Sequence, residues 1–236
     1  MTQVRIPILT YHQIDRIPPK VDAKGVRTKF RSLIISPASF ARQMWLLKIV
    51  GYRGVNMSEV IAYLRGEKTV EKHGKIVGIT FDDGYQNNLR HALPVLRRHG
   101  FSSTCYAVSS LTGKTNQWDA DNGVARKLLM SEIELREWIA GGQEVGSHTR
   151  HHVNLNQVDR AIAKIEITQS KEELQAITGI ACSHFCYPYG GYDFEHTMMV
   201  RTAGYDSATT TEHGIADTSH GVFELPRIGV LKNTNL

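Results

Sequence analysis

Cysteine is scarce in this sequence of 236 residues. The three cysteines, Cys105, Cys182 and Cys186, are an odd number without the regular spacing of a disulfide framework. A disulfide-rich secreted scaffold is therefore excluded, and we expect three small buried thiols in a reducing compartment. Residues 2–14 lack the basic and apolar regions of a signal peptide, and no apolar run reaches membrane-spanning length. We therefore expect a cytoplasmic protein without a transmembrane segment.

Concentrated positive charge is also lacking, although the formal net charge is +5. The basic residues are scattered apart from short pairs such as Arg97-Arg98, whereas a nucleic-acid-binding protein needs them clustered on one face. A solvated basic surface explains this pattern, so we expect no nucleic-acid partner. The sequence also lacks internal repeats and low-complexity tracts. With 41% hydrophobic and 22% charged residues, it predicts a single globular domain over residues 1–236.

Two adjacent carboxylates stand at the end of an apolar run. Residues 75–81 are rich in strand-forming side chains, and Asp82-Asp83 follows them directly. Gly84 then allows a sharp turn into a helical pattern over residues 85–99. Asp83 could simply cap that helix, but one cap needs only one aspartate. In barrels of alternating strands and helices, catalytic residues stand at the carboxyl ends of strands, and this pair has that position.

Strand and helix patterns alternate along most of the chain. We expect strands over residues 4–11, 75–81, 103–108, 143–147, 183–187 and 205–209, and helices over 37–50, 58–65, 85–99, 131–140, 158–177 and 194–203. Ser36 is the expected cap of the first helix, and Ser131 with Glu134 forms a capping box. This alternation predicts a parallel sheet covered by helices, and the number of units favours a barrel.

Two long segments without periodicity are expected to form loops at the rim. Residues 15–33 are rich in proline, lysine, arginine and glycine, and long loops in a compact domain are more often functional than idle. Residues 109–130 form the second loop and contain Trp118. This side chain could stack on a substrate or could pack the loop against the domain, and the sequence leaves both alternatives open.

Three histidines follow the expected strand at residues 143–147. His148 and His152 are separated by four residues, so on one helical turn both imidazoles could bind the same metal while His151 points elsewhere. The zinc-protease signature is not met, because Thr149 stands where that motif requires glutamate. Histidines at ligand spacing after one strand, together with carboxylates after another, indicate a metal site.

These motifs resemble a known family. Thr80-Phe81-Asp82-Asp83-Gly84, His148 to His152, and Tyr187-Pro188-Tyr189-Gly190 are similar, in this order, to the first three motifs of the polysaccharide deacetylase family, also called the NodB-homology family. The resemblance covers most of the chain. It implies a distorted, incomplete β/α barrel of about seven strands that binds one divalent metal, usually zinc, and hydrolyses acetyl groups on sugars.

The resemblance also implies roles for individual residues. Asp83, His148 and His152 become the metal ligands, with one position open for water or the acetyl carbonyl. Asp82 becomes the general base, since adjacent side chains at a strand end point in opposite directions. The backbone N–H of Tyr189 becomes the donor to the oxyanion, a contribution of about 3 kcal/mol to the transition state.

The chain departs from the family pattern at two positions. Cys186 stands where an arginine is usual, and the late histidine motif that supplies the acid is absent. The circularly permuted branch of poly-N-acetylglucosamine deacetylases instead has an N-terminal Tyr-His, which Tyr11-His12 matches, and a Leu-Pro-Arg-Ile segment, which residues 225–228 match. This branch therefore assigns the acid to His12, and we expect Arg227 to replace the missing arginine beside Asp82.

Two other interpretations compete with parts of this assignment. Cys182, His184 and Cys186 alternate along one expected strand and could be a second metal site, although such alternation is more often coincidental. The departures from the motifs also allow a catalytically inactive saccharide-binding protein on the same fold. We favour a metal-dependent deacetylase, most simply a zinc enzyme, whose substrate is an N-acetylated saccharide.

Overall fold

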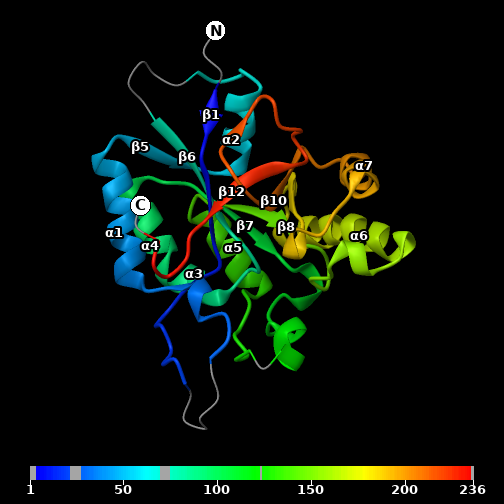
Figure 1. Cartoon of the computed structure of the whole chain (residues 1–236), viewed down its shortest axis with the longest axis horizontal. Helices are drawn as coiled ribbons and strands as arrows, with labels where there is room; N and C mark the ends of the chain where they lie inside the picture. The colour runs from blue at the N-terminus through cyan, green and yellow to red at the C-terminus, as the bar shows by residue number, and fades with distance from the viewer. Residues whose placement is uncertain (1–3, 22–27, 70–74, 123, 235–236) are drawn as a thin grey trace.

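Parallel strands form a closed barrel at the centre of the protein (Figure 1). The computed structural model describes residues 4–21, 28–69, 75–122 and 124–234. The barrel strands are β2 (Ile8–Tyr11), β6 (Lys75–Phe81), β7 (Thr104–Ala107), β8 (Glu144–Ser147), β9 (His184–Cys186), β10 (Ser207–His213) and β12 (Leu225–Gly229). Their order around the barrel is β2, β12, β10, β9, β8, β7 and β6, and pairing of β6 with β2 closes the ring. The predicted barrel of about seven strands is therefore confirmed.

Other short strands lie outside the ring of the barrel. β5 (Tyr52–Val55) pairs in parallel with the first half of β6. β1 (Arg5–Ile6) and β11 (Ala216–Asp217) form an antiparallel pair, and β3 (Gln13–Ile14) and β4 (Ile34–Ile35) form a parallel one. The sequence did not predict β3, β4, β5, β11 or β12, and the strand expected over residues 4–11 is divided between β1 and β2.

Helices cover the outside of the barrel. They are α1 (Pro37–Ile49), α2 (Met57–Leu64), α3 (Gln86–His91), α4 (Leu93–His99), α5 (Glu132–Ala140), α6 (Arg160–Thr178) and α7 (Phe194–Thr202). Short 3-10 helices are η1 (Arg31–Leu33), η2 (Ser109–Leu111), η3 (Gln117–Asn122), η4 (Leu155–Gln157) and η5 (Pro188–Gly190). Helix α1 packs on β5 and α4, while α5 and α6 pack on β8 and α7 packs on α6. Figure 1 shows α1 and α4 on the opposite side of the barrel from α6 and α7.

The helix caps predicted from the sequence are present in the structure, but one predicted helix is divided into two. The Ser36 side chain accepts from the Ser39 N–H, and Ser131 and Glu134 form both bonds of the capping box. The single helix expected over residues 85–99 was wrong, because the chain breaks at Ala92 into α3 and α4. Pro94 explains the break, since it lacks an N–H and its ring clashes with the preceding helical turn.

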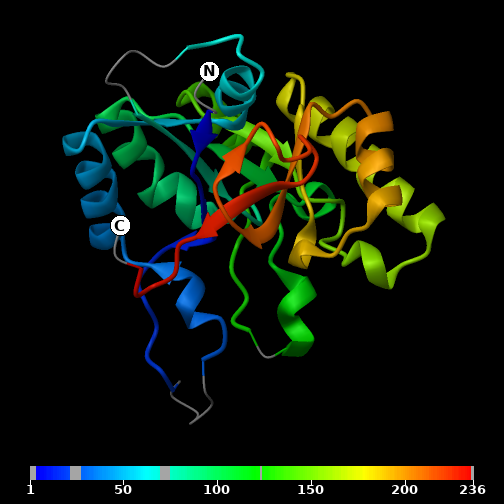
Figure 2. The same cartoon turned by 45° about the horizontal axis from the view of Figure 1, so that its top comes forward.

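The two rim loops extend from one end of the molecule. The described parts of the loop after β3 and of the loop after β7 lie side by side in both views, below the barrel in Figure 2. Neighbouring barrel strands are parallel, so their carboxyl ends share this end. Side chains from distant parts of the sequence therefore meet here. Residues 22–27 of the predicted 15–33 loop lie outside the described residues.

Candidate metal and catalytic site

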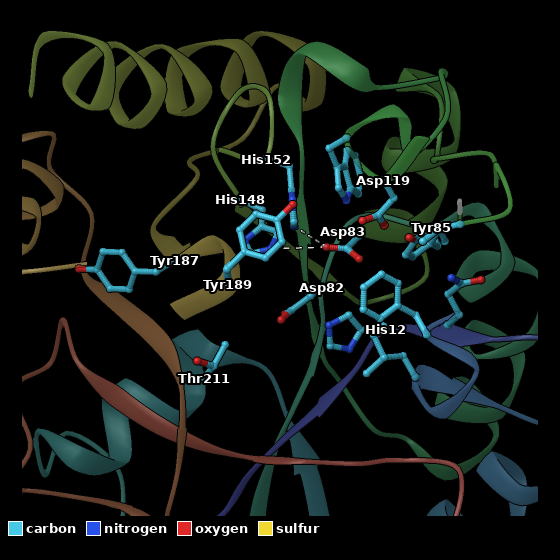
Figure 3. A pocket seen from close by; sticks show the side chains of 15 residues that line it. His12, Asp82, Asp83, Tyr85, Asp119, His148, His152, Tyr187, Tyr189 and Thr211 are labelled. Atoms are coloured by element: carbon cyan, nitrogen blue, oxygen red, sulfur yellow. Dashed lines mark ion pairs between the residues drawn. The ribbon is translucent and has the colours of Figure 1, made fainter. Parts of the chain in front are cut away.

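A cavity of about 170 Å³ opens at the carboxyl ends of the barrel strands. Side chains from seven segments line it, and they include His12, Asp82, Asp83, Trp118, Asp119, His148, His152, Tyr189 and Thr211. Figure 3 shows both aspartates near its centre, with His148 and His152 on one side and His12 across from them. The structure thus brings together the predicted residues that follow β2, β6 and β8.

Asp83 and two histidines form a compact cluster of potential metal ligands. Oδ1 of Asp83 lies 3.2 Å from Nε2 of His152 and 3.5 Å from Nε2 of His148. Potential ligand atoms of the three side chains lie within 4.8 Å of one another, and each residue is more than 90% buried. Asp83 turns toward the histidines through a left-handed backbone, with φ 74°, so it does not cap α3.

The side chains of this cluster fit a divalent cation. Nδ1 of His148 lies 2.8 Å from the carbonyl oxygen of Cys186, and a carbonyl can only accept a hydrogen bond. Nδ1 of His148 therefore carries a proton, and Nε2 is the ring nitrogen that remains available to a metal ion. Nδ1 of His152 is buried without a protein partner among the described residues. One carboxylate with two imidazole nitrogens is a donor set typical of catalytic zinc sites.

Electrostatics keeps the Asp83 carboxylate ionised. Burial by itself raises the pKa of this carboxyl group. Hydrogen bonds from His148 and His152 outweigh burial and hold the Asp83 pKa well below its ordinary value. The Asp83 carboxylate is therefore ionised at neutral pH.

The segment from His148 to His152 is not helical, so the expected helical turn was wrong. Thr149 and His152 have left-handed φ values of 62° and 59°, which fold the segment back on itself. The Glu166 carboxylate of α6 holds this conformation, because one of its oxygens accepts from the N–H groups of Arg150 and His151 at 2.9 Å each. The other oxygen binds Nδ1 of His151 at 2.6 Å, and this histidine points away from the cluster as predicted.

Asp82 has a different partner from Asp83. Its two carboxylate oxygens accept from the two terminal nitrogens of Arg227, at 2.7 and 2.8 Å. The side chains of this pair are 4% and 2% exposed. Burial raises the pKa of the Asp82 carboxyl, but the Arg227 guanidinium outweighs it and holds the pKa below the ordinary value. The structure therefore places Arg227 where the sequence predicted it.

Arg227 is itself fixed by the barrel. Its Nε donates to the carbonyl oxygen of Thr210 at 2.9 Å, and Nη1 donates to Oγ1 of Thr80 at 3.1 Å. Its Nη2 lies 3.1 Å from Sγ of Cys186. The Cys186 thiol therefore lies beside the Asp82–Arg227 pair, and the guanidinium group that binds Asp82 comes from Arg227. These contacts orient the fork of Arg227 toward Asp82.

Aromatic rings enclose the ligand cluster. The Trp118 ring stacks on His152, with 4.4 Å between centroids and 20° between planes. The Tyr189 ring meets the other side of His152 edge-on at 4.7 Å and remains 54% exposed. Tyr189 has a φ of 60°, so the chain turns sharply after Pro188. Trp118 therefore both lines the cavity and packs against His152.

The alternating residues Cys182, His184 and Cys186, the last two of them on β9, do not form the second metal site considered above. His184 binds Ser58 and Ser207 through its two ring nitrogens, at 3.0 and 2.9 Å. Cys182 is buried with the core, while Cys186 faces Asp82 and His148. In the parts of the chain that the structure describes, no ligand group combines Cys182, His184 and Cys186. All three cysteines are free and buried, as expected.

Sequence reasoning did not assign several residues that line the cavity. Asp119 is 8% exposed and lies beside Trp118, within the loop that was expected at the rim. Gln13 and Thr211 also line the cavity, from β3 and β10. Position in the rim loop was the available signal for Asp119. Nothing in the local sequence marked Gln13 or Thr211.

The sequence of this chain is similar to those of known proteins. A sequence profile of the polysaccharide deacetylase family matches residues 69–208, which is more than half of the chain. The chain belongs to the polysaccharide deacetylase family. The predicted family resemblance is thereby confirmed.

Two relatives and one solved structure illustrate the family. YxkH of Bacillus subtilis, whose name assigns it provisionally to the polysaccharide deacetylases, is 28% identical over 226 residues, 96% of this chain and 71% of that protein. A poly-beta-1,6-N-acetyl-D-glucosamine N-deacetylase of Staphylococcus aureus is 21% identical over 209 residues, 85% of this chain and 69% of that protein. Streptococcus pyogenes deacetylase PplD, solved with acetate, is 27% identical and superposes with a TM-score of 0.82 over 98% of this chain and 95% of that one.

The helices were also compared with the requirements of a membrane span. Within residues 4–21, 28–69, 75–122 and 124–234, none is both long and apolar enough to cross a bilayer.

Proposed function

We propose that this protein is a metal-dependent hydrolase that removes N-acetyl groups from a saccharide. The observation that carries the proposal is the separation of the two adjacent carboxylates. Asp83 faces two imidazoles, whereas Asp82 faces a guanidinium. Metal-assisted amide hydrolysis needs ligands that hold the metal and a base that does not bind it, and this arrangement supports both roles. The names of the relatives support a saccharide substrate.

Asp83, His148 and His152 would hold the divalent cation, which we propose to be zinc. Bound there, a zinc ion would polarise the acetyl carbonyl and make a water molecule more acidic. Three protein ligands leave room for these oxygen atoms. The hydrogen bond from His148 to the carbonyl of Cys186 keeps the ring in the orientation that metal binding needs.

Asp82 is proposed to take the proton from the attacking water. Its carboxylate is ionised, because Arg227 lowers its pKa, and it lines the same cavity as the ligand cluster. Both of its oxygens are held by Arg227, so the carboxylate keeps one orientation. A fixed base next to the water avoids the cost of orienting it during the reaction. We assign Arg227 as the residue that positions Asp82.

His12 is proposed to protonate the leaving amine, and Tyr189 to stabilise the oxyanion. An amine leaves poorly unless it is protonated, so an acid is needed across the substrate from the base. His12 follows β2 and lies across the cavity from His148 and His152, which supports this role (Figure 3). Two observations support the role of Tyr189: its backbone is left-handed, and its ring lies against His152. Its N–H is proposed to donate to the oxyanion.

Metal content tests the ligand assignment independently of activity. We expect about one zinc per chain in the purified protein and loss of most of it in His148→Ala, measured by elemental analysis. His151→Ala is the matched control, because His151 lies in the same segment but binds Glu166 instead of the cluster. Full occupancy in His148→Ala, or equal loss in both variants, would contradict the assignment.

A further inference from the structure

A second cavity, of about 310 Å³, lies on the rim beside the catalytic one. Four of the side chains that line it are basic or can become so, namely Arg90, His91, Arg126 and Lys127. Its single acidic side chain is Asp15. We refer to this cavity as the basic pocket.

The basic pocket and the catalytic cavity share a wall. Nδ2 of Asn87, which lines the basic pocket, donates to Oε1 of Gln13 at 3.2 Å, and Gln13 lines the catalytic cavity. The chain from residue 124 to 127 contributes Val124 to one cavity and Lys127 to the other. A saccharide that leaves the catalytic cavity over this wall would reach the basic pocket.

The walls of the basic pocket are anchored directly to the carboxylate turn after β6. The N–H of Met130 donates to the carbonyl of Gly84 at 2.8 Å, and the N–H of Gln86 donates to that of Leu128 at 3.0 Å. The pocket therefore has a fixed position relative to Asp83, only a few residues away along the chain. A ligand group bound in it would be held at a defined distance from the reacting acetyl group.

Acidic groups around the basic pocket are already engaged. Asp15 accepts from Nζ of Lys127 at 2.8 Å, from Asn87 at 3.3 Å and from the N–H of Arg16 at 2.7 Å. The nearby Glu134 is bonded to Gln86 and to its capping partner.

Two positive charges remain without a partner. Arg90 and Arg126 are exposed, and no described carboxylate lies within ion-pair distance of either. The catalytic cavity on the other side of the shared wall is lined by three aspartates, Asp82, Asp83 and Asp119, and by no arginine or lysine among the described residues. Arg90 and Arg126 therefore place their positive charges on the basic-pocket side of this wall.

We propose that the basic pocket binds a phosphate group carried by the acetylated saccharide. This inference rests on the proposed deacetylase function and narrows its substrate to a phosphorylated saccharide. Two guanidinium groups offer several N–H donors in fixed planes, and the three terminal oxygens of a phosphate monoester can accept more of them than the two oxygens of a carboxylate. His91 and Lys127 also line the pocket and add further N–H donors. A neutral acetylated saccharide would leave these groups in water.

The test compares three trisaccharides. Acetate release is measured from tri-N-acetylchitotriose, from the same trisaccharide with a phosphate on a terminal residue, and from one with a uronate carboxylate there. The double variant Arg90→Gln/Arg126→Gln should raise KM for the phosphorylated trisaccharide roughly tenfold, while KM for the neutral one stays within about twofold. Arg97→Gln/Arg98→Gln on α4 is the matched control, because it removes the same charge outside the basic pocket and should change neither KM.

Three outcomes would overturn the proposal. They are equal KM values for the neutral and phosphorylated trisaccharides in the unmodified protein, the same response in both double variants, and a gain with the uronate as large as with phosphate. If the unmodified protein releases no acetate from any of them, the proposed function fails instead. In that case calorimetry tests the basic pocket independently of activity. The phosphorylated trisaccharide should bind the unmodified protein more tightly than Arg90→Gln/Arg126→Gln, and equal affinities would overturn the proposal.

Discussion

Replacing Arg227 by methionine should destabilise the protein strongly, because it leaves Asp82 as a buried carboxylate without its partner. The Asp82 side chain is only 4% exposed, and both of its oxygens are bonded to the guanidinium. Removing one member of a buried ion pair costs about 3–5 kcal/mol. For a chain of this size, that loss lowers Tm by about 6–20 °C, since each kcal/mol corresponds to about 2–4 °C.

A double-mutant cycle separates this pair from general damage to the core. Unfolding in urea would be followed by circular dichroism at pH 7 with chelator present, so that metal binding does not contribute to stability. Asp82→Asn/Arg227→Met removes both charges, and it should be more stable than Arg227→Met alone by at least about 2 kcal/mol.

A surface pair provides the matched control for the cycle. Arg150→Met breaks the ion pair between Arg150 and Glu173, in which the two side chains are 26% and 31% exposed. This substitution should lower the free energy of unfolding by less than about 1 kcal/mol. Equal costs for Arg227→Met and Arg150→Met, or additive losses in the double variant, would refute the reasoning.

Three further predictions concern the acid, the close approach of strands and the response to pH. His12→Ala should lower kcat by roughly 10²- to 10⁴-fold with unchanged metal content, and loss of metal would exclude the acid role. Gly146→Ala should destabilise the protein by about 1–3 kcal/mol in urea unfolding, because the added Cβ would lie 2.6 Å from a ring carbon of Tyr106 on β7. Gly229→Ala is the control and should be neutral, because its Cβ would have no heavy atom within 4 Å. Burial raises the pKa of the Glu144 carboxyl, but its interaction with His184 at 3.6 Å, together with its hydrogen bonds from Ser58 and Thr104, outweighs burial and holds the pKa below the ordinary value of 4.5. The ionised carboxylate therefore stabilises the fold above pH 4.5, and this stabilisation is lost as the pH falls through the lowered pKa. Glu144→Gln should therefore flatten the acid side of the stability curve, and an unchanged curve would contradict this.

Much of the barrel could be predicted from the sequence because local patterns and tertiary structure agree there. The run over residues 75–81 is apolar along its length and forms β6 with those bounds. The strand β12 was not predicted, because Pro226 lacks an N–H and argues against a strand. The structure accommodates this proline next to a shift in register between β10 and β12.

The site was less predictable, because its geometry depends on contacts between distant residues. The spacing of His148 and His152 suggested a shared ligand site, but the conformation that joins them is set by Glu166 on α6. The pairing of Arg227 with Asp82 joins residues 145 positions apart, and a family resemblance suggested it where local pattern could not. The contact of Trp118 with His152 likewise depends on how the rim loop folds over the barrel.

Acetate release by the zinc-loaded protein tests the central claim most directly. The measurement compares the unmodified protein with Asp82→Asn on an N-acetylated oligosaccharide, with metal content determined on the same samples. The account predicts release by the unmodified protein and a loss of roughly 10²- to 10⁴-fold in Asp82→Asn at equal zinc occupancy. No release from the zinc-loaded protein, or near-normal release by a fully loaded Asp82→Asn variant, would contradict it.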